Sequence, residues 1–227
     1  MTARICISIL PKNKVDALNL IERAEKAQAD FIEVRLDSFE VSRKISDLSA
    51  STKIPLIGTN KLQNEKGFFV GTEAERQRTL FDAAKNGFQY IDVDFSNSKR
   101  AELVTQIKAL GAKPIVSYHK FDGILTVSTM EKILDEQIAS GASICKIVLT
   151  ANQIEDNLPV LSFVSFASTK AKLVCFCMGE YGKTSRLLSP AFGAFFTFAS
   201  LEKGIETASG QMSISEMRAA YGLLGIE

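Results

Sequence analysis

Short apolar segments alternate with helical segments along the whole chain, and this alternation limits the possible folds more than any other feature. Eight segments rich in apolar and β-branched residues have the character of buried strands: 5–9, 31–36, 54–57, 90–95, 114–118, 143–149, 173–177 and 194–199. Helical periodicity predicts helices between them at 15–28, 73–86, 101–110, 130–139 and 214–224. Thr72 and Glu75 predict a capping box at the start of one of these helices. Strands that alternate with helices indicate a parallel sheet.

The number of strand segments favours one closed barrel. Eight candidates in 227 residues fit a (β/α)8 barrel better than an open, doubly wound sheet. No G-x-G-x-x-G turn or Walker-type lysine follows the first strand segment, which argues against a nucleotide-binding fold. No linker rich in Pro, Gly or Ser divides the sequence, so we expect residues 1–227 to form a single α/β domain of the TIM-barrel class.

Composition excludes several classes of partner. The 27 Lys and Arg residues nearly balance the 26 Asp and Glu residues, so a general attraction to nucleic acid or to anionic lipid is not expected. The apolar stretch 5–10 is too short for a signal peptide or a membrane span, and we expect a cytoplasmic protein. Four cysteines lie in apolar runs without C-x-x-C spacing, which predicts buried reduced thiols. The single histidine excludes a histidine-rich metal site.

Polar side chains within the strand segments can be assigned to a face by parity. Ile32, Val34 and Leu36 share one face of their strand, and Glu33, Arg35 and Asp37 share the other. Helices cover the outside of a barrel, so the polar set is expected inside it, near the C-terminal strand ends where barrel enzymes carry their active sites. The same parity places four further polar residues inside the barrel: Asp92, Asp94, Ser117 and His119.

Lys146 lies in the middle of the apolar segment Ser-Ile-Cys-Lys-Ile-Val-Leu, and a lysine is almost never fully buried without a partner or a suppressed charge. Two interpretations follow. Burial beside cations such as Arg35 or Arg186 would give a neutral amine, which is a Schiff-base nucleophile. Alternatively, Lys146 forms a structural ion pair with a carboxylate, for which the candidates are Glu33, Asp92 and Asp94.

His119 follows the strand next to that of Lys146, so both side chains are expected in one cavity, with Asp94 near enough to orient the imidazole ring. Arg186 follows the seventh strand segment. Its fork of donors suits a substrate carboxylate, and the alternative is a solvated arginine at a helix start. The small residues of 207–211 are suited to form a lid.

Six short motifs together resemble the type I 3-dehydroquinate dehydratase family. In chain order they are Glu33-Val-Arg35-Leu-Asp37, Ser117-Tyr-His119, Cys145-Lys146-Ile-Val, Met178-Gly-x-x-Gly182-x-x-Ser185-Arg186, Phe192-Gly193 and Gly210-Gln211. The resemblance implies a (β/α)8 barrel, usually a homodimer, that converts 3-dehydroquinate to 3-dehydroshikimate in the shikimate pathway of aromatic amino-acid biosynthesis. It also implies a lyase that needs no metal and no cofactor.

The resemblance also implies a role for individual residues. Lys146 would form the Schiff base, His119 would be the general acid and base, and Arg186 would bind the substrate carboxylate. Substrate hydroxyls would meet Glu33 and Arg35, the pocket would be lined by Met178 and Phe198, and Gln211 would belong to the lid. Three positions depart from the family pattern but keep the chemical class: Lys61 replaces an arginine, Asp94 replaces a glutamate that pairs with the histidine, and Thr207 replaces a lid serine.

Two other functions fit parts of the sequence. A class I aldolase also uses a Schiff-base lysine in a barrel, but it would need a phosphate cradle after the last two strands, where this chain has an arginine instead of a glycine-rich nest. A non-catalytic barrel that only binds a small acid would not need a reactive lysine. Borohydride reduction in the presence of substrate would distinguish it from an enzyme.

Overall fold

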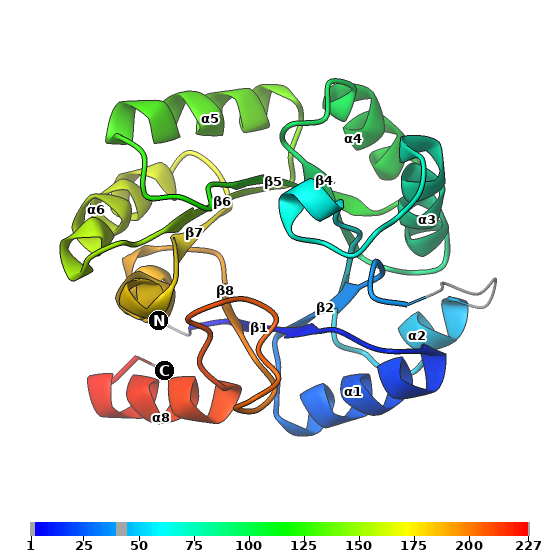
Figure 1. Cartoon of the computed structure of the whole chain (residues 1–227), viewed down its shortest axis with the longest axis horizontal. Coiled ribbons are helices and arrows are strands. Elements are labelled where there is room, and N and C mark those ends of the chain that lie inside the picture. The colour runs from blue at the N-terminus through cyan, green and yellow to red at the C-terminus, as the bar shows by residue number, and fades with distance from the viewer. Residues whose placement is uncertain (1–2, 40–44, 227) are drawn as a thin grey trace.

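Eight parallel strands form one sheet that curls into a barrel in this computed structural model, which describes residues 3–39 and 45–226 (Figure 1). The order along the sheet is β7-β6-β5-β4-β3-β2-β1-β8. The strands are β1 (Ile5–Ile9), β2 (Phe31–Arg35), β3 (Leu56–Thr59), β4 (Tyr90–Asp94), β5 (Lys113–His119), β6 (Ile144–Thr150), β7 (Leu173–Met178) and β8 (Thr197–Ala199). The backbone N–H of Phe195, just before β8, donates to the carbonyl oxygen of Leu173 in β7 at 2.6 Å and so links the two ends of the sheet.

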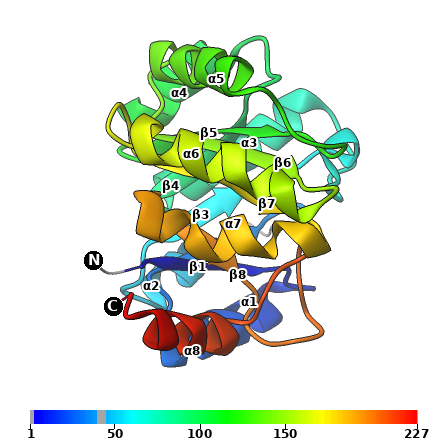
Figure 2. The same ribbon diagram turned by 90° about the vertical axis from the view of Figure 1, so that its left-hand side faces the viewer.

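Helices surround the strands, as expected for the (β/α)8 barrel that the sequence predicts, and the fold prediction is confirmed (Figure 1). They are α1 (Lys14–Lys26), α2 (Ser46–Ala50), α3 (Glu73–Lys85), α4 (Arg100–Ala109), α5 (Val127–Ala139), α6 (Asn157–Ala167), α7 (Lys183–Leu188) and α8 (Ile214–Leu224). Figure 2 shows α5, α6, α7 and α8 one above another on the side turned to the viewer. None of the helices in the described residues is both long and apolar enough to cross a membrane.

Some element boundaries differ from the sequence prediction. β3 begins at Leu56 instead of residue 54, and β8 is limited to Thr197–Ala199. Periodicity did not indicate α2 and α7, which have five and six residues, because so short a segment cannot display an amphipathic repeat. It also missed α6, which is apolar around most of its circumference and therefore lacks a polar face.

Strand side chains pack in two layers, as the parity argument predicts. Ile32 and Val34 point outward and pack under the helices in a large apolar cluster. A separate cluster, which includes Phe31, Ile144, Val148 and Phe196, fills the inside of the barrel. The four cysteines are buried and free, as predicted. The cavity that the polar side chains line lies toward the C-terminal strand ends.

Candidate active site

An open cavity of about 150 Å³ lies among the C-terminal ends of the strands, where barrel enzymes bind their substrates. Ten of the eleven site residues predicted from the sequence line it. They are Glu33, Arg35, Lys61, His119, Lys146, Met178, Arg186, Phe198, Thr207 and Gln211. The eleventh, Asp94, lies behind Lys61 and does not line the cavity.

Lys146 reaches into the cavity from β6 and is 5% exposed. Its Nζ lies 3.6 Å from Oε1 of Glu33 and 3.5 Å from Oδ2 of Asp92, and 4.3 Å above the centre of the Phe198 ring. The ion-pair alternative is therefore present in the structure, with Glu33 and Asp92 as the partners. The same Lys146 amine also faces the cavity.

Glu33 is held in place from both sides. Its Oε2 accepts a hydrogen bond from the hydroxyl of Ser8 at 2.5 Å, and its Oε1 accepts one from the hydroxyl of Thr59 at 2.9 Å. Arg35, two residues along the same strand, donates to both carboxylate oxygens of Asp37 at 2.9 and 2.6 Å. These contacts hold the side chains of Glu33 and Arg35 in fixed orientations at the cavity.

His119 lies at the end of β5, adjacent to the strand of Lys146, and its ring stacks on Phe121 at 6.0 Å between centroids. Burial lowers the pKa of His119 well below its usual value, and the positive charges of Lys61 and Lys146 lower it further. The imidazole is consequently neutral at neutral pH. A neutral ring can accept a proton from a substrate in the cavity.

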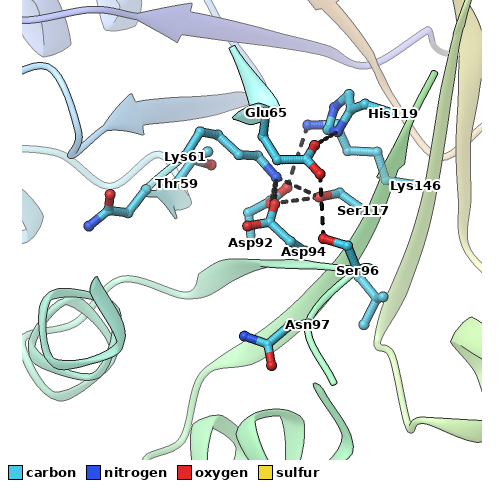
Figure 3. Close-up of polar contacts among 12 residues, drawn as sticks. Thr59, Lys61, Glu65, Asp92, Asp94, Ser96, Asn97, Ser117, His119 and Lys146 are labelled. Carbon is cyan, nitrogen blue, oxygen red and sulfur yellow. Dashed lines mark hydrogen bonds and ion pairs between the residues drawn. The ribbon is translucent and has the colours of Figure 1, made fainter. Parts of the chain in front are cut away.

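The carboxylate that faces His119 belongs to Glu65 and not to Asp94, which corrects the sequence prediction (Figure 3). Oε2 of Glu65 lies 3.9 Å from Nδ1 of His119. Asp94 is unavailable because Lys61 occupies one of its oxygens and Arg76 the other, the latter at 2.9 Å. Burial, together with the negative charges of Asp94 and Asp92, raises the pKa of Glu65.

The position of Glu65 in the chain offered a signal that the sequence interpretation did not use. Glu65 follows Lys61 by four residues in the loop after β3, and barrel active sites are built from the loops that follow the strands. Phe121, which also lines the cavity, was missed in the same way, in the loop after β5.

Lys61 joins two carboxylates behind the cavity wall. Its Nζ donates to Oδ1 of Asp92 at 2.6 Å, to Oδ1 of Asp94, and to the hydroxyl of Ser117 at 2.8 Å (Figure 3). Burial alone would lower the pKa of Lys61, but Asp92 and Asp94 more than offset this effect and hold it above its usual value. Lys61 therefore stays cationic.

Arg186 lies in α7 and is 1% exposed, so it is not the solvated arginine that the sequence left as an alternative. Its guanidinium stacks 4.4 Å above the Phe176 ring, and Nη2 makes one long hydrogen bond, 3.4 Å, to the carbonyl oxygen of Ser209. Its Nε has no partner, and within residues 3–39 and 45–226 it forms no ion pair. Burial lowers the pKa of Arg186 to about 9, which leaves it charged at neutral pH.

The segment that was expected to form a lid closes one side of the cavity. The backbone N–H of Gly179, after β7, donates to the carbonyl oxygen of Ser209 at 3.2 Å. Gly210 has a φ of +71°, and a side chain there would collide with the carbonyl oxygen of Gly179, so only glycine permits this close approach. Gln211 and Thr207 are bonded to each other, with the Thr207 N–H donating to Oε1 of Gln211 at 2.7 Å.

Comparison with protein families decides the assignment. The model of type I 3-dehydroquinase matches residues 5–227. The chain belongs to this family. A 3-dehydroquinate dehydratase of Desulfotalea psychrophila is 34% identical over 221 residues, covering 96% of each chain. One from Methanococcus maripaludis is 31% identical over 222 residues, covering 97% of this chain and 99% of the relative.

Solved structures of the family agree on the fold. The crystal structure of 3-dehydroquinate dehydratase from Geobacillus kaustophilus has a TM-score of 0.89 at 23% identity and covers 99% of this chain, while this chain covers 92% of it. Family membership confirms the expected class of enzyme, a hydro-lyase, and favours it over the aldolase and over the non-catalytic barrel.

Proposed function

We propose that this 3-dehydroquinase converts 3-dehydroquinate to 3-dehydroshikimate through an imine on Lys146, with His119 as the general acid and base. One observation carries the proposal: an amine and a neutral imidazole on adjacent strands open into the same cavity. The Phe198 ring beneath Lys146 lies 6.1 Å from the Phe176 ring beneath Arg186, so the amine and the guanidinium stand on neighbouring rings of one cavity floor.

Imine formation begins when the Lys146 amine attacks the ring ketone. The attacking amine must be neutral, and Glu33, 3.6 Å from Nζ, is placed to take up its proton. Asp92 is a poorer acceptor, because the charges of Lys61 and Lys146 outweigh its burial and hold its pKa below the usual value. Loss of water from the addition product gives a protonated imine. This group withdraws electrons and makes the C–H bond on the neighbouring carbon acidic.

His119 then performs both proton transfers. Its neutral imidazole removes the proton from the neighbouring carbon, and the electron pair of that C–H bond moves into the imine to form an enamine. The enamine returns its electrons to expel the β-hydroxyl, which leaves as water after taking the proton from His119. Glu65, 3.9 Å from the ring, stabilises the imidazolium that exists between the two steps. Hydrolysis of the imine releases the product and restores Lys146.

The remaining cavity residues bind the substrate. Arg186 has donors free for the carboxylate, and a guanidinium fork matches a carboxylate in two-point contact. Substrate hydroxyls meet Glu33 and Arg35, and Lys61 adds its positive charge to the same cavity wall while its three N–H groups stay bonded to Asp92, Asp94 and Ser117. The apolar walls and the lid are formed by Met178, Phe198, Thr207 and Gln211, which line the same cavity.

Borohydride reduction tests the proposal directly. Incubation with 3-dehydroquinate and borohydride is expected to inactivate the protein and to leave one stable adduct, which peptide mass mapping places on Lys146. Lys146→Ala should give no adduct. The matched control is Lys66→Ala, which removes another cavity lysine and should keep the adduct. An adduct on another residue, or full activity after reduction, would refute the Schiff base.

A further inference from the structure

Besides Arg35 and Arg186, a third buried arginine lies just outside the cavity and is not explained by the mechanism. Arg76 projects from the first turns of α3, which begins with the predicted capping box of Thr72 and Glu75, and it is 2% exposed. Its Nε and Nη2 pair with the carboxylate of Glu73 at 2.7 and 2.9 Å. Its Nη1 points inward and serves two acceptors, Oδ2 of Asp94 at 2.9 Å and the backbone carbonyl of Asn60 at 2.8 Å.

The contact with Asp94 connects Arg76 to the cavity wall. Asp94 accepts from Arg76 with one carboxylate oxygen and from Lys61 with the other, so the three side chains form a continuous chain from the helix to the cavity. An aspartate held at both oxygens cannot rotate. Without Arg76, one oxygen of a 3% exposed carboxylate would lose its donor, and Asp94 would be free to turn and to carry the Lys61 ammonium with it.

The contact with Asn60 fixes the start of the loop after β3. Asn60 immediately precedes Lys61, and the same loop carries Glu65. The loop folds back tightly, since the N–H of Phe69 donates to the carbonyl oxygen of Lys61 at 3.1 Å and a side chain at Gly67 would collide with that oxygen. A displacement at Asn60 would therefore move Lys61 and Glu65 together, and Glu65 is the carboxylate that faces His119.

Charge balance gives a second reason for a cation at this position. Asp92 and Asp94 share the single ammonium of Lys61, and Lys146 approaches Asp92 from the other side. Arg76 supplies one more positive charge to this buried group, and its fork reaches acceptors in three different residues at once. A lysine amine is a point charge and cannot keep this geometry.

From these contacts we infer that Arg76 is a positioning residue for the dehydration: it fixes Asp94 and the Asn60 carbonyl so that Lys61 and Glu65 keep their places at the cavity. This inference rests on the proposed function. It assigns to Arg76 no contact with the substrate and no proton transfer.

Kinetics of three variants test the inference. Arg76→Met is expected to lower kcat/KM by about 10- to 100-fold, the loss typical of a displacement of order 1 Å in a catalytic group. Both KM and kcat should change, because Lys61 lines the cavity and Glu65 faces His119. Arg76→Lys should recover only part of the loss. Arg78→Met removes an exposed arginine two residues away on the same helix and should behave like the wild-type protein.

A double-mutant cycle separates positioning from a general loss of structure. In an Asp94→Asn background, Arg76→Met should cost less than it does in the wild-type protein, because the contact with the Asp94 carboxylate is already lost and only the contact with the Asn60 carbonyl remains to be removed. This double variant leaves no unpaired buried charge, so it should fold even if Arg76→Met alone is unstable. In that case Arg76→Lys replaces Arg76→Met in the comparison of kcat/KM. Equal losses in both backgrounds, or wild-type kinetics in Arg76→Lys, would overturn the inference.

The Lys146 adduct tests the proposed function separately from the role of Arg76. Borohydride trapping on Lys146 should persist in Arg76→Met, because Arg76 does not take part in imine formation. A wild-type protein without dehydratase activity or without the Lys146 adduct would refute the proposed function. If the wild-type protein is active and the Arg76 variants have the same kcat and KM, only the positioning role is refuted.

Discussion

Replacing Arg186 with methionine separates substrate binding from stability more cleanly than any other change in this site. Methionine replaces only the aliphatic part of the arginine side chain, so Arg186→Met removes the guanidinium with its charge, its donors and its stacking on the Phe176 ring. If Arg186 binds the substrate carboxylate through two charge-assisted hydrogen bonds of about 1.5–3 kcal/mol each, the variant loses about 3–6 kcal/mol of binding free energy. At about 1.4 kcal/mol per factor of ten, KM rises by roughly 10²- to 10⁴-fold.

The same substitution should not weaken the fold. Arg186 is buried with a single long hydrogen bond and, among the described residues, no ion pair, so the folded protein bears the cost of desolvating its charge without a compensating partner. The free energy of unfolding of Arg186→Met is therefore expected to equal or exceed that of the wild-type protein. Arg76→Met is the matched control, because Arg76 is equally buried but paired with Glu73 and Asp94, and breaking a buried ion pair costs about 3–5 kcal/mol.

Two measurements check these expectations. Initial rates over a range of 3-dehydroquinate concentrations, followed through the ultraviolet absorbance of the conjugated enone product, give KM and kcat. Urea denaturation gives the free energy of unfolding for both variants. Arg186→Lys should recover part of the KM, since an ammonium keeps the charge but not the planar two-point contact. A KM for Arg186→Met close to the wild-type value, together with a loss of stability like that of Arg76→Met, would show that Arg186 is structural.

His119 supports two further predictions. His119→Ala should still form the imine on Lys146 but lose about 10²- to 10⁴-fold in turnover, so that mass spectrometry detects the accumulated, borohydride-reducible adduct; near-normal turnover would show that another base acts. His119 is the only histidine, so NMR can follow its titration without ambiguity, and the ring should remain neutral well below pH 6.5. The unfolded chain binds this proton more readily than the folded one, so protonation of His119 lowers the free energy of unfolding. The free energy of unfolding is therefore unaffected by His119 above about pH 6.5, and it decreases as the pH falls from there through the lower pKa of the folded state. His119→Ala should abolish this part of the pH dependence.

Much of the site could be predicted because strand periodicity is local. The alternation of Glu33 and Arg35 with Ile32 and Val34 assigns the charged pair to the inside of the barrel without knowledge of any other strand, and the structure agrees. Lys146 was identified in the same way, since a cation in the middle of an apolar strand must have a partner or a function. The helices were predicted where an amphipathic repeat exists and missed where it does not, as in α6.

The choice of partners could not be predicted from the sequence. Asp94 has the parity and the strand position to face His119, yet it meets Lys61 and Arg76, and the carboxylate near His119 comes from Glu65 in the loop after β3. Arg76 showed no signal at all in the sequence, because an arginine in the first turns of a helix is usually solvated.

The sequence by itself determined the barrel, the inward face of each strand and the polar strand residues that reach the cavity, because these depend on the repeat of two residues in a strand and on the order of strands and helices. The tertiary structure alone decided which carboxylate neutralises which cation. Lys61 and Asp94 are 33 residues apart in the chain, and their contact depends on the stagger of neighbouring strands and on side-chain lengths measured in ångströms. Coulomb interactions fall off with distance in space and not along the chain, so the lowered pKa of His119 and the raised pKa of Lys61 arise only in the folded barrel.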